Sequence, residues 1–391
     1  MNFKIVNKKE RKIVVINQSV SYLTVDIINA FTTKADEVSV ISGNIQYFRD
    51  TLNSSVKVER INTLKENPSS MKALSYINAC LRIWFLLLTK YRKHEVFFLS
   101  VPPMGYLLNL MVSNRFSILV WDVYPDVFKI MGMKESHPIY KFWGYLNKKS
   151  FAKAYRLYTI GERMADLLDV YVDRSKLLIT PLWSKFQENN NKGKENNPFI
   201  QKYNLEDKFI VQYSGNIGLT HNVEVMIEMA ELLKHRKDIL FQIIGKGERK
   251  SILRKKAEIK RLLNCQFLPF QNDEMFPYSL SAADLGVVIL DNRTSKGSVP
   301  SKSYNLMSYG IPSLYIASED SELSYYTKKY GHAKCFSDKE IEDAVRFIEE
   351  LVDSNELRAR MKQTALKASL NYKKKNADKI VDLYFNNTVI D

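Results

Sequence analysis

The sequence predicts an α/β protein built from two doubly wound parallel sheets. Short β-branched runs alternate with segments of helix length, and this alternation stops and then restarts around residues 187–198. Parallel strands need crossover connections, so the alternation favours βαβ units over hairpins. A chain of 391 residues also fits two domains, since one domain usually has roughly 100–200 residues. We expect an N-terminal domain over residues 1–185, a C-terminal domain over 186–372 and a final segment over 373–391.

The first half supplies the strands and crossovers of one sheet. Five runs are predicted as strands: Lys12–Ile16, Val38–Ile41, Val56–Ile61, Val96–Val101 and Phe116–Val120. Helical spacing fills most of the gaps between them, as in Tyr22–Phe31 and Ser70–Tyr91. The half is completed by further elements in this order: helix Pro138–Ala154, strand Leu157–Ile160, helix Glu162–Tyr171 and strand Leu177–Leu182.

A surface linker is predicted next, because residues 187–198 lack core-forming side chains and are rich in Asn, Lys and Glu. After it the alternation restarts. The expected strands are Phe209–Tyr213, Ile239–Ile244, Cys265–Leu268, Leu285–Leu290 and Ser313–Ile316. The expected helices are Val223–Lys234, Glu248–Leu263, Asp273–Ala283 and Ser301–Tyr309, with helical spacing almost throughout Asp338–Asn387.

Composition narrows the function classes. The chain has 58 Lys and Arg against 43 Asp and Glu, and residues 1–180 hold 26 of the basic and 15 of the acidic residues. A basic half suits nucleic acid, an anionic membrane or a phosphorylated substrate. No helix-turn-helix, RNP-like or zinc-finger pattern is present, so nucleic acid is not expected as a partner. Three distant cysteines and five histidines without ligand spacing predict neither a disulfide scaffold nor a metal site.

Two features concern membranes. Residues 1–12 are polar and basic with no apolar run behind them, so no secretory signal is expected. The uncharged run Val96–Asn114 is interrupted by Pro102 and Pro103, which favours a strand, a turn and a core helix over a spanning helix.

The segment Met71–Lys93 has two interpretations. It combines Trp84 and other apolar residues with Arg82, Lys90 and further basic residues. Such a helix can lie on the membrane surface with its cations near anionic head groups. It can equally be a core helix whose basic C-terminal turn is favoured by the helix dipole. The residues leave these two interpretations open, and the surface interpretation would place the protein in the cytoplasm, peripherally on the cytoplasmic membrane.

Glycine-rich turns follow two strands of the second half. Gly215, Asn216 and Gly218 come directly after strand Phe209–Tyr213, and Gly245-Lys246-Gly247 follows strand Ile239–Ile244. Glycines between a strand and a helix let backbone amides approach a phosphate. They also serve simply as tight strand-to-helix turns, and a turn lysine such as Lys246 is usually solvated.

The loop after strand Leu285–Leu290 carries Arg293, Ser298, Ser301 and Lys302. Hydroxyl groups here can donate to a ligand. Lys302 would stand in the first turn of a helix, where the dipole favours an acidic residue. A bound anion explains a lysine at this position better than helix stability does, although ordinary surface placement is the alternative.

In the first half, strand Phe116–Val120 runs into Trp121 and then Asp122, Tyr124 and Asp126. Two carboxylates flanked by aromatic residues at a strand end are typical of a sugar-binding and acid/base corner. The other interpretation is that both aspartates stabilise turns.

These elements together resemble the retaining family-four glycosyltransferases, the "glycosyl transferases group 1" family with the GT-B fold, and especially its bacterial capsule and O-antigen branch. The resemblance covers most of the chain. It rests on the order of the following elements: DVYP at Asp122, YSGNIG at Tyr213, IGKG at Ile244, FLPF at Phe267, AADL at Ala282, VPSKSY at Val299 and YGIP at Tyr309. It implies two Rossmann-like domains that face a cleft, with C-terminal helices that cross back to the first domain.

The resemblance further implies a metal-independent, retaining hexosyltransferase that uses a nucleotide-sugar, most simply a UDP-sugar, and no other cofactor. The acceptor would be an undecaprenyl-diphosphate-linked saccharide at the inner face of the membrane, near Asp122 and Asp126. The second domain would hold the donor through these residues: Gly215, Asn216, Gly218, Lys246, Leu268, Phe270, Arg293, Ser301, Lys302 and Asn305. The pyrophosphate would lie on the Gly215–Gly218 loop, Ser301 and Lys302, and the base beside Leu268–Phe270.

The chain also departs from the family. The usual pair of glutamates falls on Gly297 and Asn305, the basic residues of the first glycine loop on Asn216 and Asn222, and a common histidine on Asp122. Lys302 and Arg293 are the candidates for the missing positive charge. Two alternatives therefore stay open: a non-catalytic subunit that binds a partner transferase, and a UDP-sugar epimerase.

Overall fold

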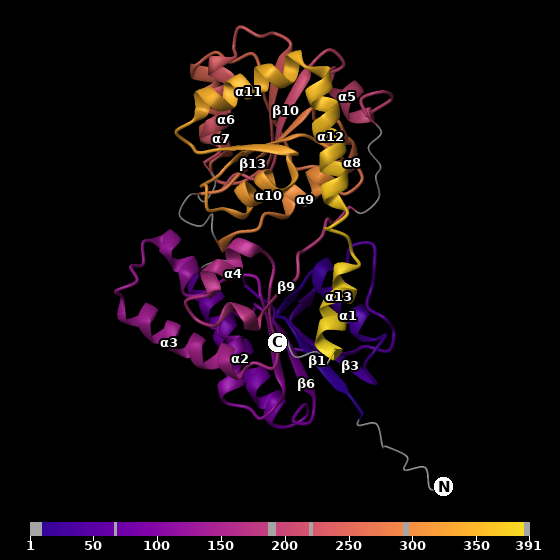
Figure 1. The fold of residues 1–391 in the computed structure, drawn as a ribbon, viewed down its shortest axis with the longest axis vertical. Coiled ribbons are helices and arrows are strands. Elements are labelled where there is room, and N and C mark those ends of the chain that lie inside the picture. Colours follow the sequence, from indigo (N-terminus) through magenta and orange to yellow (C-terminus); the bar gives the residue numbers. More distant parts are fainter. Residues whose placement is uncertain (1–9, 66–68, 187–192, 219–221, 292–296, 387–391) are drawn as a thin grey trace. The chain divides into compact units, whose positions relative to one another are not determined.

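The computed structural model describes residues 10–65, 69–186, 193–218, 222–291 and 297–386. The chain divides into two compact units, residues 1–182 with 374–391, and residues 183–373. Each unit contains a parallel sheet with helices packed on it (Figure 1). The predicted fold class is therefore confirmed.

The first unit has a seven-stranded parallel sheet in the order β5-β3-β1-β6-β7-β8-β9. Its strands are β1 (Lys12–Ile16), β3 (Glu37–Ser42), β5 (Lys57–Arg60), β6 (Glu95–Leu99), β7 (Phe116–Val120), β8 (Leu157–Thr159) and β9 (Leu177–Ile179). A separate two-stranded pair is formed by β2 (Ser19–Val20) and β4 (Asn44–Ile45). The strand order reverses between β1 and β6, which is the arrangement of a doubly wound sheet.

The helices of the first unit include the last helix of the chain. They are α1 (Tyr22–Phe31), α2 (Ser69–Leu88), η1 (Gly105–Leu110), η2 (Asp126–Met131), α3 (Pro138–Lys153), α4 (Glu162–Leu168), η3 (Arg174–Lys176) and α13 (Asn376–Phe385). Figure 1 shows α13 beside α1, and the ring centroids of Tyr384 and Phe31 lie 5.2 Å apart. The Tyr384 hydroxyl donates to Glu95 Oε2 at 2.7 Å. The C-terminal helix thus completes the core of the first unit, as the GT-B resemblance implied.

The second unit has a six-stranded parallel sheet in the order β12-β11-β10-β13-β14-β15. Its strands are β10 (Phe209–Asn216), β11 (Ile239–Lys246), β12 (Cys265–Leu268), β13 (Leu285–Ile289), β14 (Ser313–Ile316) and β15 (Ala333–Phe336). The order reverses between β10 and β13. Ligands of doubly wound sheets bind at this crevice, outside the carboxyl ends of the strands.

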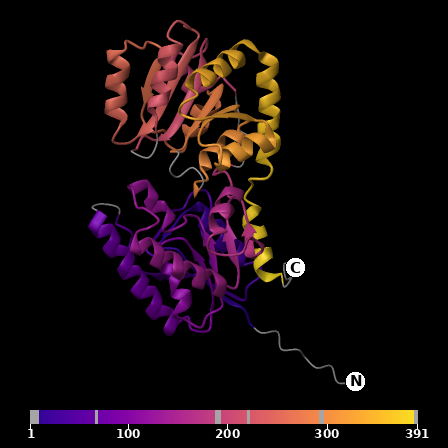
Figure 2. The ribbon, with the colours of Figure 1, turned by 60° about the vertical axis from the view of Figure 1, so that its left-hand side comes forward.

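Helices cover both faces of the second sheet (Figure 2). They are α5 (Pro198–Tyr203), α6 (Glu224–Leu232), α7 (Lys250–Ile259), α8 (Phe276–Ser281), α9 (Ser301–Ser308), α10 (Glu322–Tyr330), α11 (Ile341–Asp353) and α12 (Asn355–Ser369). The main core joins fully buried residues of β10 and β11 to apolar residues of α6 and α11, among them Tyr213, Phe241, Met226 and Ile348. This core fixes the strand ends that carry the glycine turns.

Three elements of the second unit were not expected from the sequence: α5, α10 and β15. The β15 segment, AKCF, has only four residues and no β-branched side chain, so its pattern does not predict a strand. It is a strand because it pairs along its length with β14. Strands β10 and β11 also run further than expected, through Gly215 and Gly245, because the two segments stay paired in register.

Candidate functional site

A pocket of about 250 Å³ opens at the carboxyl end of the second sheet, where β10 pairs with β13. Its lining comes from β10, β13, α8 and α9, and from two segments that follow β9 and β12. The polar lining residues are Lys185, Gln212, Ser214, Gln271, Asp273, Ser301, Lys302 and Asn305. The aromatic ones are Phe186, Phe270 and Phe276. The pocket therefore occupies the ligand-binding position that the strand order predicts.

Lys302 brings a positive charge to this pocket. It stands in the first turn of α9, and its Nζ donates to Tyr213 Oη at 3.2 Å while lying 4.5 Å from the Tyr213 ring centroid. Within the ranges that the structure describes, no carboxylate forms an ion pair with this ammonium. Burial lowers the pKa of Lys302 to about 8. A cation with no carboxylate partner is the group that an anionic ligand would neutralise.

The start of α9 adds to this positive potential. Pro300 occupies the N-cap position without a side-chain hydrogen bond, and the first turn of the helix contains no acidic residue. The first amides of a helix have no partner within the helix, and they form the positive end of its dipole. Because the helix also carries Lys302, its N-terminus is suited to a phosphate group.

Gly215 allows the lysine to lie against the end of β10. A Cβ atom built on Gly215 would lie 2.2 Å from Lys302 Nζ and 2.3 Å from its Cε. Any larger residue would push the ammonium away. The glycine therefore has a specific role at the pocket, beyond that of a tight turn.

The second glycine turn is explained by backbone packing instead. A Cβ on Gly245 would lie 1.9 Å from the Gly215 carbonyl oxygen, and one on Gly247 would lie 2.3 Å from the Ile217 carbonyl oxygen. The Ile217 amide donates to the Lys246 carbonyl at 2.9 Å, so it is not available to a phosphate. Lys246 itself is exposed and does not line the pocket. Its Nζ lies 6.0 Å from the ring centroid of Phe270.

Of the remaining residues predicted to hold the donor, some line the pocket and others do not. Phe270 lines the pocket with 57% of its surface exposed, whereas Leu268 is buried in a core cluster and does not line the pocket. Asn216 is exposed at the end of β10, with its side chain beside Gly218. Arg293 lies outside the described residues.

Ser301 and Asn305 both line the pocket. Ser301 is exposed at the start of α9, and Asn305 Oδ1 accepts a hydrogen bond from Ser184 Oγ at 2.8 Å. The Asn305 side chain, which stands where the family usually has a glutamate, is thus oriented by the neutral Ser184 hydroxyl.

Sequence reasoning missed one wall of the pocket. Lys185 Nζ pairs with Asp273 Oδ1 at 2.8 Å, and the rings of Phe186 and Phe276 stack with centroids 4.8 Å apart. These residues come from two segments without a recognisable motif. The one available signal was their position, since Lys185 and Phe186 directly precede the polar linker.

The pocket can bind an anion and a planar ring, but it offers little for proton transfer. Asp273 is the one carboxylate among its described lining residues, and it is paired with Lys185. The described residues also contain no group of three or more His, Cys, Asp or Glu that could hold a metal ion.

In the first unit, Asp126 has a structural role, which corrects the prediction that it is catalytic. Its side chain is buried, and its Oδ1 accepts from the Tyr140 hydroxyl and lies 2.9 Å from Lys129 Nζ. Its Oδ2 accepts from the Tyr171 hydroxyl at 2.7 Å. Both oxygens are occupied by residues of later segments, which the local sequence could not indicate.

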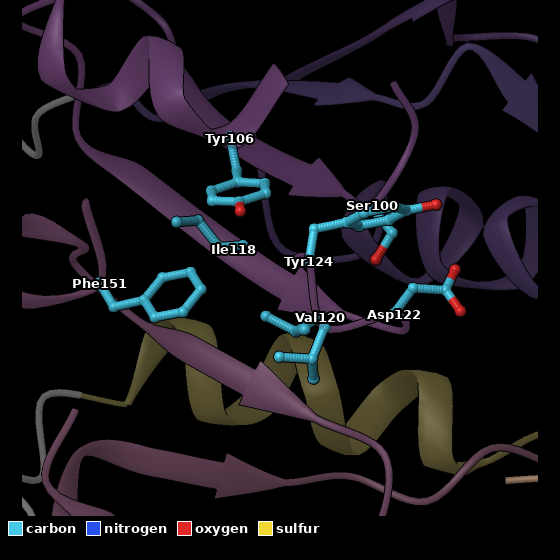
Figure 3. Close-up of a pocket in the computed structure, with 8 residues that line it drawn as sticks. Ser100, Tyr106, Ile118, Val120, Asp122, Tyr124 and Phe151 are labelled. Atoms are coloured by element: carbon cyan, nitrogen blue, oxygen red, sulfur yellow. The ribbon is translucent and has the colours of Figure 1, made fainter. Parts of the chain in front are cut away.

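Asp122 is exposed, in contrast to Asp126. Figure 3 shows its carboxylate directed away from Ile118, Val120 and Phe151, which line a small cavity. That cavity measures about 10 Å³, room for no more than one water molecule, so it is not a sugar site. The aromatic faces beside it are also in use, because Tyr124 stacks on Trp143 with centroids 5.7 Å apart. A catalytic Asp122 stays a prediction.

Helix α2 has an apolar face on each side. Ala79, Ile83 and Leu87 are buried in the unit, and Trp84 is half-buried. The other face exposes six large apolar residues: Met71, Leu74, Ile77, Leu81, Phe85 and Leu88. Among the described residues, one helix, Ser70–Leu88, is long and apolar enough to cross a membrane by length and composition alone.

The two cations predicted to face lipid are partly neutralised. Arg82 and Lys90 lie 4.0 Å and 2.6 Å from the carboxylate of Glu59, a residue of β5. The core-helix interpretation describes the buried face of α2, whereas contact of its exposed face with a membrane stays a prediction.

The second unit matches a known family. The model of the family described as glycosyl transferases group 1 matches residues 195–368. The chain is 31% identical over 141 residues to WcaI of Escherichia coli (strain K12), named for glycosyl transfer in colanic acid biosynthesis. It is 27% identical over 230 residues to WbjE of Pseudomonas aeruginosa, named as a glycosyltransferase. These matches span 34% and 56% of the two relatives, so the chain spans between a third and somewhat more than half of their lengths.

Solved structures extend the similarity to the whole chain. WaaG, a glycosyltransferase involved in lipopolysaccharide biosynthesis, has a TM-score of 0.68 at 14% identity, covering 96% of this chain and 100% of WaaG. Anabaena HepE in complex with UDP and glucose has a TM-score of 0.68 at 10% identity, covering 96% and 99%. The second unit therefore matches the glycosyl transferases group 1 family over residues 195–368, and the chain has the GT-B fold of these glycosyltransferase structures.

Proposed function

We propose that the protein transfers a sugar from a nucleotide-diphosphate sugar, most simply a UDP-sugar, during the synthesis of a cell-surface polysaccharide. The observation that carries this proposal is the Lys302 ammonium, which lies against Gly215 without a carboxylate partner among the described residues. Relatives named for colanic acid and lipopolysaccharide biosynthesis, and a similar structure with bound UDP, support the same class of reaction.

The donor diphosphate would be held by the Lys302 ammonium, the Ser301 hydroxyl and the first amides of α9. Phe270 would face the base, and Asn305 would hydrogen-bond the ribose. When the sugar leaves, negative charge grows on the diphosphate, and a fixed cation and fixed amides stabilise that charge best in a pocket screened from water.

Retention of the anomeric configuration is the stereochemical part of the proposal. Asp273, the carboxylate among the described lining residues, is paired with Lys185 and so is a poor base or nucleophile. A donor phosphate oxygen would then accept the acceptor proton on the same face of the sugar that the diphosphate leaves. This route needs no carboxylate from the pocket.

The acceptor is proposed to be a saccharide linked to undecaprenyl diphosphate at the cytoplasmic face of the membrane. The exposed apolar face of α2, with basic residues at both ends of the helix, supports contact with such a surface. Asp122, exposed after β7, is the candidate group for acceptor contact.

The test combines a donor panel with one substitution. The protein is incubated with UDP-sugars and with undecaprenyl-diphosphate-linked acceptors, and UDP affinity is measured for the native protein and for Lys302→Ala. Charged hydrogen bonds contribute about 1.5–3 kcal/mol, so UDP affinity should fall roughly 10- to 100-fold. The control is Lys260→Ala, an exposed lysine that pairs with Glu231 outside the pocket, and this variant should bind UDP normally.

The outcomes separate the candidate functions. Sugar transfer supports the proposal, and an unchanged dissociation constant for Lys302→Ala contradicts it. UDP binding without turnover on any donor would support a non-catalytic subunit, which is favoured by the lack of an unpaired carboxylate among the described lining residues. Epimerised donor without acceptor would support an epimerase.

A further inference from the structure

Tyr213 contacts the Lys302 ammonium, the cation at the pocket, from the protein core. It is a residue of β10, its side chain is fully buried, and it does not itself line the pocket. Its ring is 4.5 Å from Lys302 Nζ, within the range of a cation–π contact. A buried tyrosine next to a ligand-binding lysine can do more than fill the core.

The direction of its hydrogen bonds is fixed by chemistry. An ammonium can only donate, so Tyr213 Oη accepts from Lys302 Nζ at 3.2 Å. The hydroxyl proton is then available to the Asn216 carbonyl oxygen, 2.6 Å away. One hydroxyl therefore connects the lysine of α9 to the backbone that follows Gly215.

We propose that Tyr213 is a positioning residue for the diphosphate site, a role that rests on the proposed function. It holds the Lys302 ammonium against Gly215 and leaves the other two ammonium N–H groups for phosphate oxygens. A free lysine side chain loses rotamer freedom when it is ordered. Because Tyr213 orders the Lys302 side chain before the ligand arrives, ligand binding loses less conformational entropy.

The competing interpretation is that Tyr213 only packs the core. Its hydroxyl would then be replaceable, and any effect of its removal would be independent of Lys302. A double-mutant cycle distinguishes the two interpretations, because residues that act through one another give non-additive effects.

The experiment measures binding of UDP, inorganic pyrophosphate and uridine to four proteins: native, Tyr213→Phe, Lys302→Ala and the double variant. Tyr213→Phe keeps the ring and removes the hydroxyl. UDP and pyrophosphate should bind about tenfold more weakly to Tyr213→Phe, which corresponds to one charged hydrogen bond. In the Lys302→Ala background the same substitution should change affinity less than about twofold, and uridine should be unaffected throughout.

Tyr315→Phe is the matched control. Tyr315 is equally buried in β14, and its hydroxyl pairs with His332 Nε2 at 2.8 Å, away from the pocket lining. UDP affinity should stay within about twofold in this variant, because no ligand-contacting charge depends on it.

A pH profile adds a readout that core packing would not change. The Tyr213 oxygen accepts from the charged form of Lys302, so its removal should shift the decline of UDP affinity to lower pH. The other titratable groups that line the pocket, Lys185 and Asp273, are paired with each other and are untouched by this substitution.

Three results would overturn the proposal. The first is multiplicative effects of the two substitutions, and the second is an unshifted pH profile. The third is native-like UDP affinity of Lys302→Arg, which keeps the charge but not its position; this variant decides the matter if Tyr213→Phe does not fold. Tight pyrophosphate binding without sugar transfer would contradict the proposed function alone, whereas a native protein that binds neither UDP nor pyrophosphate would contradict both.

Discussion

Lys302 illustrates how a single residue can be unfavourable for folding and useful for binding. Removing an ammonium from water without a counter-ion is costly, and here that cost appears as a pKa lowered by burial to about 8. Near neutral pH the lysine is still mostly protonated. An arriving diphosphate restores the solvation that the ammonium lost, so the residue is held ready for an anion.

The first prediction at this scale concerns pH. UDP binds the protonated form of Lys302, so its affinity should be steady near pH 7 and fall as pH rises through about 8, by up to about tenfold per pH unit. Calorimetric titrations across this range measure the effect. Lys302→Ala should lose the decline, and a native profile that stays flat to pH 10 would contradict a role for Lys302 in binding.

At the scale of elements, α2 presents apolar side chains in two opposite directions. The helical spacing of Met71, Leu74, Leu81, Phe85 and Leu88 places them on one exposed stripe, opposite the buried positions. A contiguous exposed apolar stripe usually marks an interaction surface. The proposed occupant is the surface of an anionic bilayer.

Vesicle sedimentation tests this placement. The native protein should sediment with anionic vesicles at low salt and less so at high salt. Leu81→Glu should weaken sedimentation roughly tenfold or more, because a buried leucine contributes about 1.5–3 kcal/mol and the glutamate is repelled by anionic lipid. Leu232→Glu, at a similarly exposed leucine of α6, is the control and should sediment normally. Equal sedimentation of both variants would exclude α2 as the contact.

The sequence was sufficient for most elements and for part of the site. Strands β1, β7, β12 and β14 have the expected bounds, because each is a short run of mainly apolar residues. The same local pattern does not predict the strand Ala333–Phe336, which forms because the segment pairs with β14.

For the site residues, too, only features encoded by local sequence could be predicted. Gly215, Ser301 and Lys302 were predictable because one strand end and one helix start carry them. The Lys185–Asp273 pair joins residues 88 positions apart, and Asp126 meets Tyr171 across 45 positions. No local pattern encodes such contacts, which is why the pocket wall was missed and Asp126 was given the wrong role.

At the scale of the molecule, the first unit is made from two separate parts of the chain and the second from one. Helix α13 supplies Tyr384, whose ring meets Phe31 and whose hydroxyl donates to Glu95. Arg11 Nη2 binds the same carboxylate oxygen at 2.7 Å and extends over the Tyr384 ring. The stability of the first unit therefore depends on residues at the far end of the sequence.

Unfolding experiments can test this dependence. Tyr384→Ala should destabilise the first unit by about 3–5 kcal/mol, as expected for a large aromatic residue removed from a core. Tyr384→Phe, which loses only the hydroxyl, should cost about 1–2 kcal/mol. Tryptophan fluorescence reports mainly on the first unit, because three of the four tryptophans lie there, Trp84, Trp121 and Trp143, and only Trp183 lies in the second. A shift of the UDP-sensitive transition instead would contradict the assignment of α13.

The split first unit has a consequence for biosynthesis. Domains tend to fold as units while the ribosome works, at roughly 5–20 residues per second. All residues of the second unit have been made once synthesis passes residue 373. The first unit is still incomplete at that point, because α13 has not been made and the aromatic residues around Phe31 lack the Tyr384 ring that covers them. A nascent or prematurely terminated chain would thus carry a folded second unit and a first unit with exposed apolar surface, which chaperones and proteases recognise.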